Sequence, residues 1–397
     1  MDQIVPAATT PQAIPGSAAV GTHGHADRRE QANTRSLVIW LVASAVCVIL
    51  TLIIGGITRL TESGLSITVW EPVSGVLPPL NEADWTAAFQ RYLAIPEAQS
   101  VHRGITLPQF KTLFWWEWAH RLIARIAGLV IAVPFFILWA KRKLPQGRTL
   151  PLLALPLLIA AQGALGWYMV SSGLSERTDV SQYRLVAHLG LALVIYVIAV
   201  WTAMEVGLGH NDPETPGRPG TRARPAMVIA TLTFITLLSG GFVAGLDAGH
   251  VYNTFPLMGA SLVPDGYGQM QPLWRNWFEN PAAVQFNHRA LAMLLLMAVA
   301  WAWARERRSA STRRMQLAWN VIALAALLQV TLGIATLLLA VPIPIAALHQ
   351  LGAVALLTAA LWAAALASAR PASRQSSTSS SRASSTARVT RAMTPES

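Results

Sequence analysis

The sequence predicts an all-α polytopic membrane protein whose eight transmembrane helices form two pseudo-symmetric four-helix bundles. Of its 397 residues, 53% are hydrophobic and 12% are charged, whereas a soluble domain carries about 25% charged residues. This composition excludes a water-soluble enzyme. Eight apolar runs each provide the roughly 20 residues that a helix needs to cross a bilayer, and motifs of the first four runs recur in the last four.

The eight predicted spans include two that share one uncharged stretch, from Met315 to Ala369. We divide this stretch at Val341-Pro342-Ile343-Pro344 because proline removes a backbone donor and ends helices. Without the division the chain would have seven spans. The predicted spans are residues 36–57, 115–140, 150–171, 183–206, 225–246, 281–304, 317–340 and 345–368.

Basic residues predict the direction of the chain. The two tails and three alternate loops hold 20 Lys and Arg, and the remaining loops hold six. Positive loops tend to stay in the cytoplasm, so both termini are predicted to be cytoplasmic, and the second, fourth, sixth and eighth spans start at the outer face. The net charge of +11 therefore reflects membrane topology, and we expect no nucleic acid partner.

The segments outside the spans divide the chain into parts. Residues 1–35 are polar and rich in Pro and Ala, without the features of a cleavable signal peptide, and we expect a disordered cytoplasmic tail. Residues 369–397 form a Ser/Thr/Arg low-complexity segment that is also expected to be disordered. A cytoplasmic linker, 207–224, joins the first bundle, 36–206, to the second, 225–368.

Four histidines lie within a repeat of the two halves. Because each half has an even number of spans, the halves point the same way, and all four histidine-bearing spans run inward from the outer face. Each histidine is one to two turns into its helix at 1.5 Å rise per residue, so the four share one depth. The matching strings are Gly55-Gly56 with Gly240-Gly241, Glu117-Trp118-Ala119-His120-Arg121 with Gln285-Phe286-Asn287-His288-Arg289, Gln162 and Gly166 with Gln329 and Gly333, and His188-Leu189-Gly190 with His349-Gln350-Leu351-Gly352.

Two histidines per bundle indicate a heme site. Ionisable residues inside membranes are costly and usually functional, and opposed histidines without a Cys, Asp or Glu cluster suit an iron macrocycle bound on both axial faces. Zinc would require three or four ligands. The alternative is that each histidine makes a hydrogen bond inside its bundle.

Arginines stand beside the histidines. Arg121 and Arg289 directly follow His120 and His288, where they are placed to pair with heme propionates, and Arg125 and Arg184 add charge beside the first histidine pair. Anchoring to lipid headgroups is the alternative.

The two halves differ at one chemically important position. Glu117 lies three residues before His120 and hence on the same helix face, and the second half has Gln285 there. A carboxylate can take a proton or stabilise developing positive charge, and an amide does neither well. The asymmetry predicts chemistry in the first half and a redox or structural heme in the second. A rim carboxylate paired with Arg121 is the alternative.

The outer loops are predicted to cover the bundles. Loop 58–116 contains an amphipathic helical pattern behind a possible cap at Asn81, and this helix is expected to lie in the interface as a lid. Loop 247–280 is expected to cover the second bundle. Three histidines fall in loops and are expected at the surface, namely His102, His210 and His250. The apolar positions of the amphipathic pattern are Trp85, Phe89, Tyr92 and Leu93.

Together these motifs resemble the heme A synthase family, in its proteobacterial and mitochondrial branch. The resemblance covers residues 36–368 and implies oxidation of the C8 methyl of heme O to a formyl group by two successive hydroxylations, making heme A for terminal oxidases. Some relatives have paired outer-loop cysteines, which this chain lacks. The strings that carry the resemblance are Gly55-Gly56-Ile57-Thr58-Arg59-Leu60-Thr61, Ser63-Gly64-Leu65-Ser66, Glu117-Trp118-Ala119-His120-Arg121, Gln162-Gly163-Ala164-Leu165-Gly166-Trp167 and Asn253-Thr254-Phe255-Pro256-Leu257-Met258-Gly259.

The resemblance also implies roles for individual residues. His120 and His188 would hold the substrate heme O, Glu117 would assist at the reacting methyl, and His288 and His349 would ligate the iron of a permanent heme b. It implies a bacterial inner membrane location, heme O synthase and cytochrome oxidase assembly factors as partners, and an unknown electron acceptor. Whether the protein is a homo-oligomer stays open.

Two other functions fit part of the sequence. A di-heme b-type electron-transfer cytochrome explains the four histidines but not Glu117. A transporter is compatible with parallel repeats and with intramembrane histidines acting as a proton relay.

Overall fold

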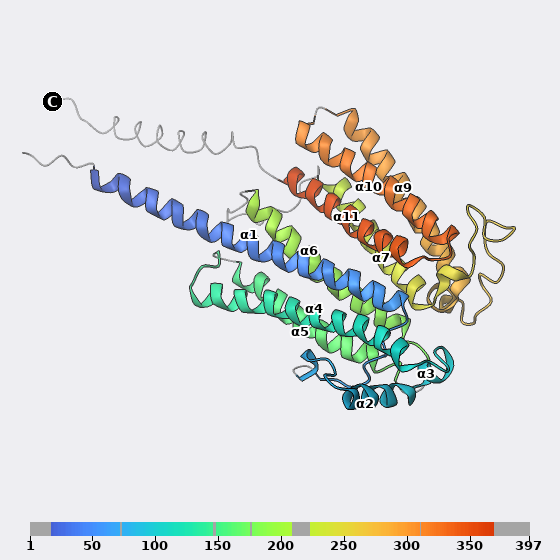
Figure 1. The fold of residues 1–397 in the computed structure, drawn as a ribbon. Coiled ribbons are helices and arrows are strands. Elements are labelled where there is room, and N and C mark those ends of the chain that lie inside the picture. Colours follow the sequence, from blue (N-terminus) through green and yellow to red (C-terminus); the bar gives the residue numbers. More distant parts are fainter. Residues whose placement is uncertain are drawn as a thin grey trace, which may run out of the picture.

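The computed structural model describes residues 17–71, 74–145, 148–174, 177–208, 223–309 and 311–368 (Figure 1). Within these residues the chain is all-helical, and eight long apolar helices are candidate membrane spans. This confirms the predicted number and type of spans and a multi-pass membrane protein. The eight helices are α1 (Ser17–Leu60), α4 (Leu107–Ala140), α5 (Thr149–Val170), α6 (Gln182–Gly207), α7 (Arg224–Gly245), α9 (Pro281–Arg307), α10 (Arg313–Leu338) and α11 (Ile343–Ser368).

Helix boundaries differ from prediction mainly at the N-terminal ends. α1 begins at Ser17, so the expected tail is helical from residue 17 onward, and its candidate span is Gln31–Leu60. α4 begins at Leu107, ahead of its apolar run, because the Gln109 side chain accepts a hydrogen bond from the Thr106 backbone N at 2.9 Å and caps the helix. The disorder predicted for residues 1–16 and 369–397 lies outside the described residues.

The division of the last apolar stretch is confirmed. α10 ends at Leu338 and α11 begins at Ile343. Between them Ala340 and Val341 take positive φ values of 56° and 60°, a conformation that L-residues rarely adopt within helices. The chain therefore reverses direction before the prolines, and seven spans are excluded.

The eight long helices form two rings. α1 packs against α4 and α6, and α5 closes the first ring by packing against the same two helices. α7 packs against α9 and α11, and α10 closes the second ring in the same way. The rings meet where α6 contacts α7 and α11, and where α1 contacts α11 (Figure 1). α4 and α6 therefore lie opposite each other in one ring, as α9 and α11 do in the other.

The larger of the two clusters of buried apolar side chains lies toward one end of the rings. It occupies residues 37–48 of α1, 131–138 of α4, 193–206 of α6 and 354–364 of α11. The four histidines lie toward the opposite end, which carries the long loops, and all four are half-buried. The densest apolar packing thus stops before the level of the histidines.

The loop end carries the shorter helices. α2 (Glu82–Leu93) is capped by Asn81, whose Oδ1 accepts a hydrogen bond from the Asp84 backbone N at 2.8 Å, and α2 buries Trp85 and Tyr92. The amphipathic helix predicted behind Asn81 is confirmed, and its place in the membrane interface stays a prediction. The other short elements are η1 (Ser74–Val76), α3 (Pro96–Ser100), η2 (Ala248–His250), η3 (Leu273–Arg275) and α8 (Asn276–Glu279).

An ion-paired arginine joins the rings at this end. Arg59 Nη2, at the end of α1, donates to Asp179 Oδ2 at 2.8 Å and to Asp247 Oδ2 at 2.7 Å. Asp179 precedes α6 and Asp247 follows α7, so one guanidinium connects loops of both rings.

Candidate functional site

Each histidine of the first ring packs against a glycine of a neighbouring helix. A Cβ added to Gly55 of α1 would lie 2.6 Å from His120 Cε1 on α4, and one added to Gly166 of α5 would lie 3.0 Å from His188 Cε1 on α6. A side chain at either position would collide with the imidazole or crowd it. Glycine therefore allows each imidazole to pack against the backbone of the adjacent helix.

The second ring repeats this contact. A Cβ on Gly240 of α7 would lie 3.2 Å from His288 Cε1 on α9, and one on Gly333 of α10 would lie 2.8 Å from His349 Cε1 on α11. The centroids of the two imidazoles are 6.4 Å apart and their planes are inclined at 88°. The structure thus brings His288 and His349 together, as the sequence predicted.

Two glutamines contact His188 and His349, the second histidine of each half. Gln162 Nε2 donates to the His188 backbone O at 3.0 Å and lies 3.3 Å from the ring Nε2. Gln329 Nε2 donates to the His349 backbone O at 2.8 Å and lies 3.1 Å from the ring Nδ1. Each glutamine is four residues before the glycine that faces the same histidine, so both contacts come from one helix face.

The donor set fits heme iron. The His288 and His349 imidazoles, with centroids 6.4 Å apart, would hold a heme iron between them. Nδ1 of His120, His188 and His288 is buried without a hydrogen-bond partner among the described residues. No group of three or more His, Cys, Asp or Glu side chains able to hold a metal ion occurs in that part of the chain.

Glu117 is buried one turn before His120. Its side chain is 3% exposed, and Oε2 accepts hydrogen bonds from Ser66 Oγ at 2.8 Å and from the Ile67 backbone N at 2.7 Å. Oε1 accepts from Arg121 Nη2 at 2.6 Å. Three donors, one of them cationic, fix the two oxygens of the Glu117 side chain. The pairing with Arg121 is therefore present, and it coexists with a position beside the histidine.

Gln285 makes the opposite kind of contact. Its Nε2 donates to the Tyr252 backbone O at 3.1 Å, and its Oε1 is buried without a partner among the described residues. Arg289 donates to Tyr252 O and to Thr254 O, both at 2.8 Å. The loop over the second ring thus presents carbonyl acceptors where the loop over the first presents an N–H and an O–H donor.

The remaining predicted arginines also contact loop-end backbone. Arg121 and Arg125 donate to carbonyl oxygens of residues 67–71 at 2.7 to 3.1 Å. Arg184 donates to Tyr168 O at 2.6 Å, and its guanidinium carbon lies 3.7 Å from the centre of the Tyr168 ring. These contacts fasten the loops to the helices, and pairing with propionates stays a prediction.

Some residues differ from expectation. His102 was expected at the surface, but its side chain is 18% exposed and it pairs with Tyr92. His250 is exposed as expected, and His210 lies outside the described residues. Gly55 and Gly240 were singled out only because they recur in the two halves, and their contacts with the imidazoles of His120 and His288 were not predicted. The signal was available, because each sits in a helix of the same half at the depth of a histidine.

Alanine at Gly333 is expected to disrupt the second histidine pair. Alanine is more favourable than glycine in a helix by about 1 kcal/mol, so helix propensity would not explain a loss of heme binding. Such a loss would come from the added Cβ, which would lie 2.8 Å from His349 Cε1. We expect Gly333→Ala to lower the low-spin heme signal of the purified protein. Gly128→Ala is the matched control, because no atom lies within 4 Å of a Cβ there. Equal signals from both variants would contradict the glycine contact as a requirement.

Comparison with known proteins identifies the family of this chain. Residues 38–361 match the model of the family described as cytochrome oxidase assembly protein, COX15-CtaA. A heme A synthase of Parvibaculum lavamentivorans is 43% identical over 338 residues, which cover 85% of this chain and 96% of the relative. Heme A synthase COX15 of Homo sapiens is 46% identical over 330 residues, covering 81% and 80%. The resemblance inferred from the motifs is thereby confirmed, and the chain belongs to the COX15-CtaA family.

Proposed function

We propose that this protein is a heme A synthase, an oxidoreductase that converts the C8 methyl of heme O to a formyl group. The observation that carries the proposal is the unequal pair of sites: both have histidines resting on glycines, and the first alone adds a buried carboxylate, Glu117, where the second has Gln285. The relatives that share most of this chain's length are named heme A synthase.

In this proposal the first ring binds the substrate. His120 and His188 hold heme O by its iron, and Arg121, Arg125 and Arg184 lie at the loop end to receive its propionates. Each hydroxylation replaces one C–H bond of the methyl group by C–OH, and the resulting geminal diol loses water. Four electrons leave the carbon overall. Because three donors fix Glu117, its negative charge is positioned before the reaction to stabilise positive charge at that carbon.

The second ring has a supporting role. His288 and His349 would hold a heme b, with Arg289 at its rim, and that group supplies a one-electron redox centre. Because the methyl group is oxidised in the first ring, the second ring needs no carboxylate, and a neutral amide, Gln285, suffices there. We place the two rings in pseudo-symmetric bundles, residues 36–206 and 225–368, within the bacterial inner membrane and with both termini cytoplasmic. Heme O synthase would supply the substrate, and assembly of cytochrome oxidase would use the product.

Difference spectroscopy tests the proposal against its alternatives. A reduced-minus-oxidised spectrum of the purified protein is expected to show low-spin b-type heme, and extraction after supply of heme O is expected to yield heme A as well. The absence of any heme signal would favour a transporter. Heme b without conversion of heme O would favour an electron-transfer cytochrome.

A further inference from the structure

A chain of titratable side chains runs through the cover formed by α2 and α3, outside the histidine pairs. Tyr92 Oη lies 3.4 Å from Glu97 Oε2. The same hydroxyl lies 2.6 Å from His102 Nδ1. His102 Nε2 lies 3.6 Å from Glu62 Oε2. Carboxyl, phenol, imidazole and carboxylate thus follow one another, and the Tyr92–His102 contact at 2.6 Å is a short hydrogen bond.

The inner end of this chain is a buried acid. Glu97 is 5% exposed and packs at the edge of an apolar cluster that includes Phe110 and Leu65. The pKa of Glu97 is raised to about 8, mainly by burial and also by the carboxylates of Asp179, Glu117 and Glu62, while the Tyr92 hydroxyl lowers it. Glu97 therefore carries a proton at neutral pH.

The charged groups around Glu97 connect it to the proposed catalytic carboxylate. Asp179 is paired with Arg59 and Glu117 with Arg121. These two arginines are therefore engaged by carboxylates other than Glu97. The pKa of Tyr92 is raised mainly by burial, and Glu117 is among the carboxyl groups that also raise it. Leu65, which shares the apolar cluster of Tyr92, directly precedes Ser66, the hydroxyl donor to Glu117. The inner end of the chain thus lies within electrostatic reach of the first site.

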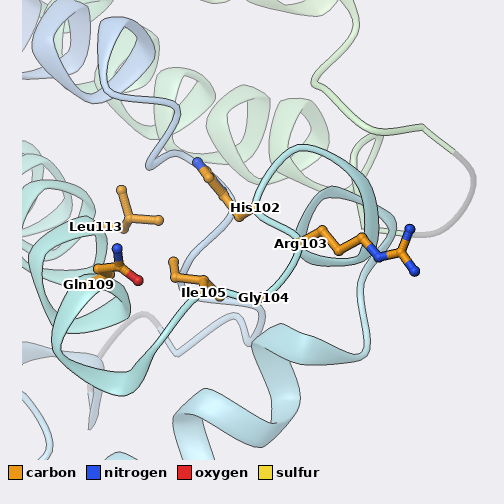
Figure 2. Close-up of a pocket in the computed structure, with 6 residues that line it drawn as sticks. All are labelled: His102, Arg103, Gly104, Ile105, Gln109 and Leu113. Carbon is orange, nitrogen blue, oxygen red and sulfur yellow. The ribbon is translucent and has the colours of Figure 1, made fainter.

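The outer end opens to solvent. His102 lines a shallow depression of about 290 Å³, together with Arg103, Gly104, Ile105, Gln109 and Leu113. Figure 2 shows the His102 ring reaching from the cover toward the segment that follows α1, where Glu62 lies with a side chain 45% exposed. A proton leaving His102 reaches water directly or through Glu62.

We propose that Glu97, Tyr92 and His102 form a proton relay between the outer aqueous phase and the site at Glu117. Glu97 passes its proton to the Tyr92 oxygen, the Tyr92 hydroxyl proton passes to His102 Nδ1, and His102 Nε2 releases a proton to Glu62 or water. Glu97 then takes up a proton released when a C–H bond of the methyl group is broken in the first site, so one proton crosses the cover per cycle. The inference rests on the proposed function.

A purely structural role does not account for the acid. An unpaired buried carboxyl costs stability relative to an apolar side chain of the same volume, and among the described residues Tyr92 is the hydrogen-bond partner of the Glu97 side chain. Buried acids with raised pKa values next to other titratable groups are typical of proton-transfer sites.

Infrared spectroscopy tests the relay without reference to turnover. Full-length wild type, Glu97→Gln, Tyr92→Phe and Glu82→Gln are compared by pH-induced difference spectra between pH about 6 and about 10. We expect a protonated carboxyl band that disappears in wild type as the pH rises through about 8, shifts in Tyr92→Phe and is absent in Glu97→Gln. Glu82 is exposed on α2, the helix that carries Tyr92, and provides the matched control. A band that persists in Glu97→Gln would overturn the assignment.

Turnover then tests the connection to the reaction. With heme content unchanged, Glu97→Gln and Tyr92→Phe are expected to lower kcat for heme O conversion about tenfold or more, and Glu82→Gln to leave it unchanged. Because Glu97 must be protonated to donate, wild-type kcat is expected to fall above pH 8, a limb that Glu97→Gln lacks. Wild-type kcat and pH profile in Tyr92→Phe would overturn the relay. Failure of the wild type itself to make heme A would refute the proposed function, and the infrared result would still decide whether Glu97 exchanges protons with water.

Discussion

Replacing Glu117 with glutamine is expected to abolish conversion of heme O while both hemes remain bound. The substitution keeps the size of the side chain and makes the first site resemble the second, which has Gln285. It removes the negative charge that Ser66, Ile67 and Arg121 hold in place. Because general acid–base and charge-stabilising groups contribute about 100-fold or more, we expect heme A formation to fall by at least that factor, measured by chromatography of extracted hemes.

Ser66→Ala separates charge from local geometry. It removes one hydrogen bond to Glu117 Oε2 and leaves the carboxylate with the Ile67 N–H and Arg121. We expect a smaller loss of activity than in Glu117→Gln, about tenfold, because two donors still hold the carboxylate and a hydrogen bond to a charged group is worth about 1.5 kcal/mol at the lower end of its range. Heme A output at the wild-type level in Glu117→Gln would remove Glu117 from the chemistry.

Replacing the histidines pair by pair is expected to give two different losses. Alanine at His288 or His349 removes one of two opposed imidazoles whose centroids are 6.4 Å apart. We expect the heme b that co-purifies with the protein to fall by more than about tenfold, because losing even an outer partner of a metal ligand lowers metal affinity by about 10–100-fold. Alanine at His120 or His188 should leave heme b in place and impair binding of heme O.

The measurement is the ratio of hemes in each purified variant, with heme b content quantified before and after supply of heme O. The contacts with Gly55, Gly166, Gly240 and Gly333 are similar in the two rings, so general destabilisation would lower both pools alike. Equal loss of heme b from all four variants would contradict the division of roles between the rings.

The main features of the helices could be predicted from the sequence because they depend on local composition. Apolar length placed the eight spans, and the prolines after Val341 divided the last two. The even number of spans per half put the four histidines at one end of the rings. Each of these arguments needs only residues that are neighbours along one helix.

The partners of Glu117 could not be predicted, because Ser66 and Ile67 lie about 50 residues earlier in a loop whose path no periodicity describes. Glu97 was missed for a related reason. An acid beside a proline in a polar loop is normally exposed, and its burial here arises because α3 folds back against α2 and the start of α4. His102 becomes part of the same cluster through that fold.

Expression of this chain together with heme O synthase, in a host that makes no heme A, tests directly whether the chain makes heme A, with the extracted hemes separated by chromatography. We predict that heme A forms when both proteins are present and that heme O alone accumulates when this chain carries Glu117→Gln. Accumulation of unchanged heme O with the wild-type chain, at normal protein and heme b levels, would contradict the proposed heme A synthase activity.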